Sequence, residues 1–272
     1  MLGSIIGDTV GSIYEFDNHK SKEFEFFGVD QWGRNCYFTD DSVMSLAIAS
    51  ALLDYKENNL PNIPFVEHMQ KIGRQYPNCG YGEHFCTWMQ TDNPRPYGSW
   101  GNGAAMRVAP CAWFANTLEE AEILAKQSSE VSHNDPEGIR GAQSTAAAIF
   151  MTRTGKSKQE IKEYIEKKYL YNLSRTCDEI RPFYTFDVSC QGTVPPAIMA
   201  FLESTSFEDA IRTAVSLGGD TDTLTAITGS IAEGFYGVPD WMIKYILSKV
   251  LDVNLATILK RTYTYLGLIP SN

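Results

Sequence analysis

The sequence predicts an all-α protein with a single domain over residues 1–272. Apolar residues recur with helical spacing in most of the chain. No Pro-, Gly- or Ser-rich linker divides the chain, and no internal repeat of fixed period occurs. Strand signals are weak and local, and the best of them lie at 23–27 and 183–188. We therefore expect helices to build the core.

The first expected helix spans 2–16 and carries a regular glycine pattern. Gly3, Gly7 and Gly11 recur every four residues, so they would share one face of the helix and leave a smooth groove there. The segment is too short and too charged to be a membrane helix that dimerises through such a groove. We expect another buried helix to pack closely against it.

The second expected helix, 40–54, predicts a buried centre for the molecule. Val43, Leu46 and Leu53 lie on one face of this helix, and Met44 and Ile48 lie on the other. A helix that is apolar nearly all round is usually buried on all sides.

Helical spacing also covers most of the second half of the chain. In 223–236, for example, Leu224, Ile227 and Ile231 form an apolar stripe. The other expected helices are 104–114, 118–131, 138–153, 157–169, 195–203, 207–217, 240–250 and 254–266. Long loops in a helical domain are usually functional or mobile, and three irregular stretches of this kind are expected. They are 17–38, 76–102 and 170–192.

Composition and charge narrow the class of protein. Hydrophobic residues make up 43% of the chain and charged residues 21%, which is typical of a globular protein with a large core. The net charge of −10 argues against nucleic acids and anionic membranes as partners, because both attract clustered Lys and Arg. A phosphate-bearing small molecule would need backbone N–H groups or metal ions to hold it.

The N-terminus and the cysteines give no sign of targeting or of a metal–thiolate site. The apolar N-terminus lacks a basic region, carries Asp8 and Glu15, and has no run near the ~20 apolar residues of a membrane span. The 6 cysteines are scattered without a CxxC motif. We therefore expect a cytoplasmic protein with reduced, packed thiols.

Two short polar motifs stand at the starts of apolar helices. They are "FTDDS" at 38–42 and "GGDTDT" at 218–223. An N-cap needs one side-chain oxygen, so capping explains one residue of each motif and leaves a surplus. Oxygen-bearing residues of the two motifs are Thr39, Asp40, Asp41, Asp220, Asp222 and Thr223, and Glu15 closes the first expected helix.

The charge of these surplus carboxylates indicates a cation-binding site. Adjacent carboxylates without Lys or Arg beside them repel one another once they are buried, and a cation relieves the repulsion. Divalent ions such as Mg²⁺ and Mn²⁺ prefer an all-oxygen set of ligands, whereas zinc fits it less well. The acids therefore suit a site for two divalent ions, provided that the fold brings the two motifs together. Asp8 lies on the same helical face as Glu15, and a buried hydrogen-bonding role is expected for it ahead of a supporting role behind the metal ligands.

A glycine-rich loop precedes the helix expected at 104–114. Such a loop can expose backbone N–H groups at a helix N-terminus, which is a favourable place for an anion. A simple glycine-rich turn explains the loop equally well. Its residues are Gly98, Ser99, Trp100, Gly101, Asn102 and Gly103, of which Trp100 could cover a ring of a ligand.

His133 lies in "VSHNDPEGIRGA" at 131–142, ahead of a helix start near Pro136. A lone histidine is more often a hydrogen-bonded structural residue than a ligand contact. The residues alone therefore leave its role open.

Five motifs occur in a characteristic order along the chain. They are "GSIIGDTVGSIYEF", "FTDDS", "GSWGNGAAMRV", "SHNDPEGIRGA" and "SLGGDTDTLTAITGSIAEGFYG". Together they resemble the ADP-ribosylglycohydrolase family from residue 2 to about residue 237. TDDS stands where many relatives have TDDT, and Ser42 is not a ligand position in the family. The tail after about residue 238 matches no motif.

The resemblance implies a compact, orthogonal multi-helix fold with a dinuclear metal centre at the base of a cleft. The cofactors it implies are two divalent ions, Mg²⁺ or Mn²⁺. By position, Glu15 matches a mobile glutamate that approaches from a gating segment, here 17–38. The loop from Gly98 to Gly103 matches a diphosphate loop, and His133 matches a histidine that contacts the phosphates or the adjoining ribose. The matching metal ligands are Thr39, Asp40, Asp41, Asp220, Asp222 and Thr223.

The reaction that the resemblance implies is hydrolysis of the bond between C1″ of ADP-ribose and an acceptor, which reverses mono-ADP-ribosylation. Such cleavage passes through an oxocarbenium-like transition state. Glu15 is the preferred general base, and Asp41 is a second catalytic candidate. The expected partner is an ADP-ribosylated protein, with an arginine linkage favoured. Hydrolysis of a free ADP-ribose conjugate, such as an O-acetyl ester, and non-catalytic ADP-ribose binding are the alternatives.

Overall fold

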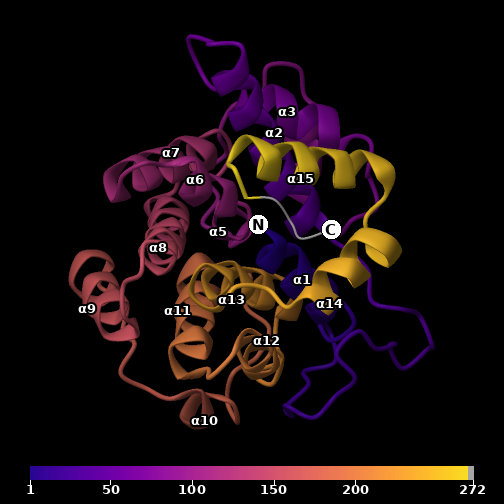
Figure 1. Ribbon diagram of the computed structural model, residues 1–272, viewed down its shortest axis with the longest axis vertical. Coiled ribbons are helices and arrows are strands. Elements are labelled where there is room, and N and C mark those ends of the chain that lie inside the picture. Colours follow the sequence, from indigo (N-terminus) through magenta and orange to yellow (C-terminus); the bar gives the residue numbers. More distant parts are fainter. Residues whose placement is uncertain (269–272) are drawn as a thin grey trace.

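The computed structural model describes residues 1–268, and its centre is a pair of helices, α1 (Leu2–Gly11) and α13 (Thr221–Tyr236). Every residue of α1 is buried, and α13 is buried from Thr221 to Glu233. Both helices lie near the middle of the view in Figure 1, with other helices around them. Polar residues near the ends of these two helices are therefore held in place by the core itself.

Close backbone contact between α1 and α13 confirms the groove expected from the glycine pattern. A Cβ atom on Gly7 would lie 2.0 Å from the carbonyl oxygen of Thr225, and one on Gly11 would lie 2.4 Å from that of Thr221. Gly3 meets α13 equally closely, at 2.1 Å. The two threonines add hydrogen bonds, since Thr225 Oγ1 donates to the Gly7 carbonyl at 2.6 Å and Thr221 Oγ1 donates to that of Gly11 at 2.9 Å. Because the contacts run in opposite directions along the two helices, the helices are antiparallel.

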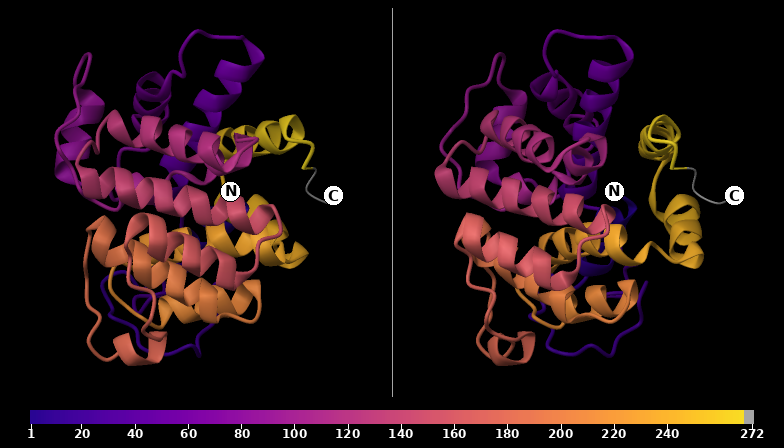
Figure 2. Two further views of the ribbon diagram at one scale, coloured as in Figure 1. Left: turned by 90° about the vertical axis from the view of Figure 1, so that its left-hand side faces the viewer. Right: turned by 60° about the vertical axis from the view of Figure 1, so that its left-hand side comes forward.

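The remaining helices surround this pair in stacked layers (Figure 2). Helix α2 (Asp40–Glu57) is buried along most of its length, as its apolar pattern predicts. Helices α8 (Pro136–Arg153) and α11 (Cys190–Glu203) pack against α13. The other elements are α3 (Phe65–Gly73), α4 (Glu83–Gln90), α5 (Gly103–Met106), α6 (Ala109–Phe114), α7 (Leu118–Glu130), α9 (Lys158–Tyr169), α10 (Cys177–Ile180), α12 (Phe207–Val215), α14 (Asp240–Tyr245), the π-helix η1 (Ile246–Val250) and α15 (Val253–Tyr265).

The first helix is shorter than the predicted 2–16. The carbonyl of Gly11 accepts hydrogen bonds from the amide of Tyr14 and from Thr221 Oγ1, both at 2.9 Å. These bonds replace the helical pattern, so residues 12–18 form turns. Glu15 therefore lies in a turn and not on the last turn of a helix.

The helix predicted over 104–114 is broken into α5 and α6. Pro110 has no N–H group to donate to the carbonyl of Met106, so the α-helical bond between them cannot form. That carbonyl accepts instead from Ser45 Oγ of α2 at 3.2 Å. The break thus ties the end of α5 to the buried helix α2.

Two short helices lie inside stretches that were predicted to be irregular, α4 within 76–102 and α10 within 170–192. Helix α3 was not predicted either. Its apolar residues Phe65, Met69 and Ile72 have helical spacing, but the segment is only 9 residues long. Short helices of this kind depend mainly on packing against their neighbours.

The described residues contain neither a strand nor a helix long and apolar enough to cross a lipid bilayer. The strand signals at 23–27 and 183–188 were therefore wrong. Backbone groups of the first segment find other partners, since the carbonyl of Phe24 accepts a hydrogen bond from Arg212 Nη1 at 2.8 Å.

We expect Gly7→Ala to destabilise the protein by about 2–3 kcal/mol or more, because the added methyl group would overlap the Thr225 carbonyl and push α1 away from α13. The measurement is the free energy of unfolding from equilibrium urea denaturation. Gly82→Ala is the matched control, since an added Cβ there meets no atom within 4 Å and φ is −60°. Equal stability losses in the two variants would contradict the inference that the close contact between α1 and α13 requires glycine at position 7.

Candidate metal centre

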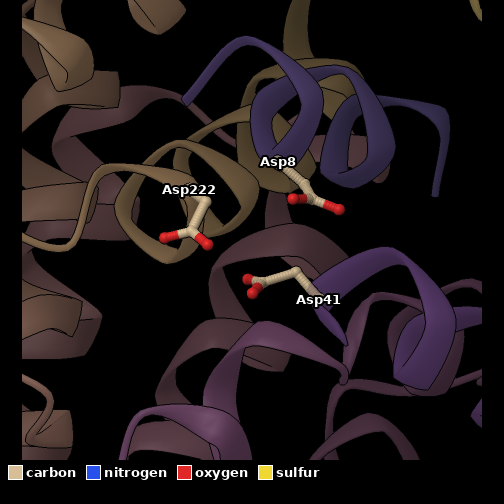
Figure 3. Close-up of side chains that lie close together, drawn as sticks. All are labelled: Asp8, Asp41 and Asp222. Atoms are coloured by element: carbon tan, nitrogen blue, oxygen red, sulfur yellow. The ribbon is translucent and has the colours of Figure 1, made fainter. Parts of the chain in front are cut away.

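Three buried carboxylates from three different helices meet where α1, α2 and α13 come together (Figure 3). Asp8 comes from α1, Asp41 from α2 and Asp222 from α13, and one oxygen of each lies within 4.8 Å of an oxygen of the other two. Glu15, Asp220 and Asp222 form a second group of the same kind. The fold thus brings the two acidic motifs together, and Asp222 belongs to both groups.

Asp8 caps helix α2 from outside, unlike the other acids of the site. Its carboxylate accepts hydrogen bonds from the backbone N–H groups and the hydroxyl groups of Thr39 and Ser42. The distances are 2.9 Å from Thr39 N, 2.7 Å from Thr39 Oγ1 and 3.0 Å from Ser42 N. An anion is favourable at this end of a helix, where the amides have no helical acceptor. The expected buried hydrogen-bonding role of Asp8 is confirmed, and the bond from Ser42 gives that residue a structural function.

One oxygen of Asp41 has partners and the other has none. Thr223 Oγ1 donates to Asp41 Oδ2 from 3.3 Å, and Thr39 Oγ1 lies 3.4 Å from the same atom. Asp41 Oδ1 is buried and has no hydrogen-bond partner within the described residues. A buried carboxylate oxygen without a donor is costly, so this atom fits a site that a cation completes.

Asp40 stands at the edge of the cluster, outside both groups of converging oxygens. It is half-buried, and its amide donates to the carbonyl of Cys79 at 2.7 Å. Its Oδ1 lies 3.3 Å from the position that a Cβ atom would take on Gly80. The segment after α3 therefore limits the space around this carboxylate.

A double-glycine turn places the second motif. Gly218 and Gly219 have φ angles of +70° and +78°, which residues with a side chain rarely adopt. Asp220 follows at the N-cap of α13 but makes no capping hydrogen bond. Its Oδ2 accepts instead from Asn102 Nδ2 at 2.6 Å. Capping therefore does not explain Asp220, and the glycine-rich loop orients its carboxylate.

These carboxylates have no cationic partner. Within residues 1–268, no Lys, Arg or His nitrogen lies within 4.0 Å of an oxygen of Asp8, Asp40, Asp41, Asp220 or Asp222. Burial, followed by repulsion from Asp222, raises the pKa of Asp40, Asp41 and Asp220 well above its usual range. The same two causes raise the pKa of Asp8 to about 7, although its hydrogen bonds lower it. Protons or cations must balance the charge of such a cluster.

Glu15 reaches the site from the turn after α1 and lies beside Asp222. Burial, followed by repulsion from Asp222, raises its pKa to about 8. Lys20 anchors the same segment, since its Nζ donates to the carbonyls of Tyr184 and Leu217 at 2.6 and 2.5 Å. The turn that carries Glu15 is thus tied to the turn that carries the second motif.

The glycine-rich loop forms one side of the site and has fewer free amides than the sequence suggests. The amide of Asn102 donates to the carbonyl of Val188 at 2.8 Å, and the amides of Gly98 and Gly101 donate to side-chain oxygens. The loop leads into α5, which is a single turn of 4 residues. Trp100 projects from the loop with 48% of its surface exposed, so it is accessible to a ligand.

His133 is buried behind this loop. Its Nε2 lies 3.1 Å from the position that a Cβ atom would take on Gly103. Its Nδ1 lies 2.8 Å from Ser132 Oγ on the opposite edge of the ring. The Nε2 edge therefore faces the loop.

A cavity of about 590 Å³ beside the site is a feature that the sequence did not indicate. Most of its wall comes from residues 170–192, and Tyr184 of this wall lies against Gly219, where a Cβ atom would be 2.8 Å from its ring. Phe186 lines the cavity and stacks on Phe16, with 5.6 Å between the ring centroids. The segment that carries Glu15 thus contacts the wall of this cavity through Phe16.

Known proteins resemble the chain over most of its length. The profile of a family described as ADP-ribosylglycohydrolase matches residues 1–262, so it extends beyond the last of the motifs near residue 237. The ADP-ribosylhydrolase ARH3 of Homo sapiens is 24% identical over an alignment 308 positions long, gaps included, which covers 88% of this chain and 84% of that protein. The ADP-ribosylarginine hydrolase Tri1 of Pseudomonas putida is 26% identical over an alignment 282 positions long, gaps included, which covers 92% of this chain and 74% of that protein.

A solved structure supports the same fold. A chain described as an ADP-ribosylglycohydrolase-related protein complex aligns with a TM-score of 0.73 and covers 96% of this chain and 95% of its own length. Its sequence identity is 20%, so this likeness concerns the fold alone. The family match, which spans nearly the whole sequence, shows that the chain belongs to the ADP-ribosylglycohydrolase family.

Proposed function

We propose that the chain hydrolyses the bond between C1″ of ADP-ribose and an acceptor, with arginine-linked ADP-ribosyl protein as the preferred substrate. The observation that carries this proposal is the buried cluster of carboxylates from α1, α2 and α13, which has no cationic partner in the described part of the chain. Such a cluster is unfavourable in a structural core and useful in a site that binds cations. Membership of the family supplies the substrate class.

The residues present fit two divalent ions. Carboxylate and hydroxyl oxygens are the donors that Mg²⁺ and Mn²⁺ prefer, and Asp41 Oδ1 is a buried oxygen in need of a partner. When bound, such ions orient hydroxyl groups of the substrate and lower the pKa of a water molecule. Asp8 stays outside the proposed ligand set because its oxygens already accept four donors. The proposed ligands are Thr39, Asp40, Asp41, Asp220, Asp222 and Thr223.

Glu15 is the proposed general base. It would take a proton from the water whose oxygen attacks C1″, while the bond from C1″ to the acceptor breaks and the acceptor leaves with a proton. Its carboxylate lies beside Asp222 and is carried by a turn, so it stands close to the proposed ions without being fixed by a helix. A base must lie within hydrogen-bond reach of the water that it activates, and the position of Glu15 beside Asp222, a proposed metal ligand, supports this role. Asp41 is the second candidate, because its Oδ1 is unpartnered.

The glycine-rich loop and His133 are the proposed contacts of the ADP-ribose diphosphate. Asn102 links the two parts of the site, since its amide group orients Asp220 while its backbone belongs to the loop. Trp100 is exposed beside the loop and offers a flat apolar surface to a ring of the ligand. The diphosphate and the scissile bond would thus lie side by side.

Aromatic side chains next to Glu15 support the arginine linkage. Phe16 is 83% exposed and stacks on Phe186 with 26° between the ring planes. A planar, weakly hydrated guanidinium group packs favourably against such rings, whereas a serine ether offers no comparable surface. Asp17 follows in the same exposed turn and adds a negative charge that suits a cationic acceptor.

Release of free ADP-ribose tests the reaction and the acceptor together. We expect release from arginine-linked ADP-ribosyl peptides in Mg²⁺ or Mn²⁺, much less from serine-linked peptides, and none after treatment with EDTA. Release from the serine linkage alone would contradict the acceptor preference. Absence of release with metals bound would favour a free ADP-ribose conjugate as substrate, and absence of both release and metal binding would favour a non-catalytic protein.

We expect Glu15→Gln and Asp222→Asn to fail in different ways. Loss of a general base typically costs ~10²–10⁴-fold, so Glu15→Gln should lower kcat by about that factor while divalent-ion affinity, measured by calorimetry, changes little. Asp222→Asn should weaken metal binding first, because Asp222 belongs to both groups of converging oxygens. Glu23→Gln is the control, since Glu23 is exposed in the same segment. Full activity of Glu15→Gln would remove Glu15 from the role of base.

The metal-free protein should lose stability as the pH rises. Asp8 has a pKa of about 7 in the folded chain, against an ordinary value of 3.8, so the folded state binds the extra proton. This contribution is complete below about pH 4 and is lost as the pH rises through about 7, with a slope of up to about 1.4 kcal/mol per pH unit. Urea denaturation at a series of pH values in EDTA measures the loss, and Mg²⁺ should reverse it at high pH. A metal-free protein that is as stable at high pH as at low pH would count against the buried acid cluster.

A further inference from the structure

Arg107 is a fully buried arginine without a carboxylate partner. It follows α5, with 1% of its surface exposed, and none of the ion pairs in residues 1–268 includes it. Its Nη2 donates to the carbonyl of Ser128 at 2.9 Å and to Ser132 Oγ at 2.8 Å. A buried guanidinium that lacks a counter-charge is costly, so its position calls for a compensating function.

Ser132 passes the effect of Arg107 on to His133. Ser132 Oγ lies 2.8 Å from His133 Nδ1, and the guanidinium can only donate, so Ser132 Oγ accepts the bond from Arg107. Within the described residues, the remaining partner of this hydroxyl is His133 Nδ1. The serine hydrogen has no other acceptor among the described residues, and a buried hydroxyl that donates to nothing is costly, so this hydrogen points to Nδ1. The ring nitrogen that accepts it carries no proton, which leaves the ring proton on Nε2.

Neighbouring rings fix the direction in which Nε2 points. The ring of His133 lies 5.7 Å from that of Tyr97 and 6.2 Å from that of Phe85, measured between centroids. Its Nε2 is 3.1 Å from the position of a Cβ atom on Gly103 and 3.7 Å from that on Gly101. Glycine at both positions leaves the space in front of Nε2 clear for a ligand on the loop.

We propose that Arg107 and Ser132 are positioning residues that hold His133 as a neutral ring with its proton on Nε2, aimed as a hydrogen-bond donor at an electron-rich oxygen on the glycine-rich loop. The assignment of that oxygen to the ADP-ribose diphosphate rests on the proposed function, whereas the position of the proton rests on the contacts of the chain alone. His133 then binds and orients the ligand and takes no part in proton transfer. The guanidinium is buried behind the histidine because it keeps a second proton off the ring.

The surroundings of His133 favour the neutral ring independently of the hydrogen bonds. Burial, followed by the charge of Arg107, lowers the pKa of His133 well below its ordinary value of 6.5. Arg107 is the charged group that faces the His133 ring. The other titratable side chains nearby are Tyr97, which packs against this ring, and His84, which packs against Tyr97. A neutral donor keeps the same hydrogen bond over the range in which an ordinary histidine changes charge, about pH 5 to 8.

Nitrogen NMR of the ¹⁵N-labelled full-length protein tests the proton position directly. The chain has 4 histidines, and the signals of His133 can be assigned by their loss in His133→Gln. We expect Nε2 to be protonated and Nδ1 to be unprotonated throughout about pH 5 to 8. A protonated Nδ1, or a doubly protonated ring near neutral pH, would overturn the proposal. This measurement needs neither metal nor substrate.

Ser132→Ala tests the positioning role, and Ser128→Ala is its matched control. Ser128 is buried like Ser132, but Arg107 bonds to its backbone carbonyl and its hydroxyl donates to the carbonyl of Ala125, so the control keeps the contact with Arg107. We expect Ser132→Ala to give a mixture of the two neutral forms of His133 in the NMR spectrum. ADP-ribose binding, measured by calorimetry, should weaken about tenfold, as for the loss of a hydrogen bond to a charged group.

The two readouts separate this inference from the proposed function. An unchanged proton position and unchanged ADP-ribose affinity in Ser132→Ala would overturn the positioning role. A wild-type protein that binds no ADP-ribose would overturn the assignment of the ligand together with the proposed function, while the NMR spectrum would still decide where the proton lies. Thermal unfolding of both serine variants shows whether the fold is kept, and only a specific effect of Ser132→Ala on the ring supports the inference.

Discussion

The backbone contact between α1 and α13 is the constraint on which the site depends. Glycine on one helix and threonine or glycine on the other let the two backbones touch, and threonine hydroxyls bond across the seam. This contact fixes the end of α1 against the start of α13. The carboxylates of Asp8 on α1 and Asp222 on α13 therefore lie close together. A bulkier seam would separate the carboxylates that the site has to bring together. The small residues between α1 and α13 therefore determine both the packing of the core and the distance between the carboxylates of the site.

The acids of the cluster have two different roles. Asp8 stabilises the start of a helix, whereas the others keep carboxylate oxygens free to bind a ligand. Both carboxylate oxygens of Asp8 are used at the start of α2, where they accept hydrogen bonds from the amides and hydroxyls of Thr39 and Ser42. Because Thr39 and Asp8 accept the hydrogen bonds of the amides at the start of α2, Asp41 does not have to, and its Oδ1 stays without a partner in the described part of the chain. A helix that is capped from another element can thus present its own first-turn carboxylates to a ligand.

The opposite side of the site is neutral or cationic. Asn102 donates to Asp220, and Arg107 acts through Ser132 on His133, so donors of the glycine-rich loop face the acids across the site. The proposed substrate and metal ions suit this division, since a diphosphate needs hydrogen-bond donors and cations need oxygen ligands. Keeping the two sides apart prevents the buried arginine from pairing with the acids and cancelling the charge that would hold the proposed cations.

The sequence by itself determined the helical class, the buried character of α2, the close helix contact at Gly3, Gly7 and Gly11, and the family, because spacing and motif order are local properties of the chain. Pro110 interrupts the helix expected over 104–114, but the sequence did not determine that Ser45 of α2 donates to the carbonyl freed at the end of α5. Nor could it decide which acid caps a helix and which stays free, or that the two acidic motifs meet. Those outcomes depend on which donors lie within hydrogen-bond distance after folding, and such donors come from segments far apart in the sequence.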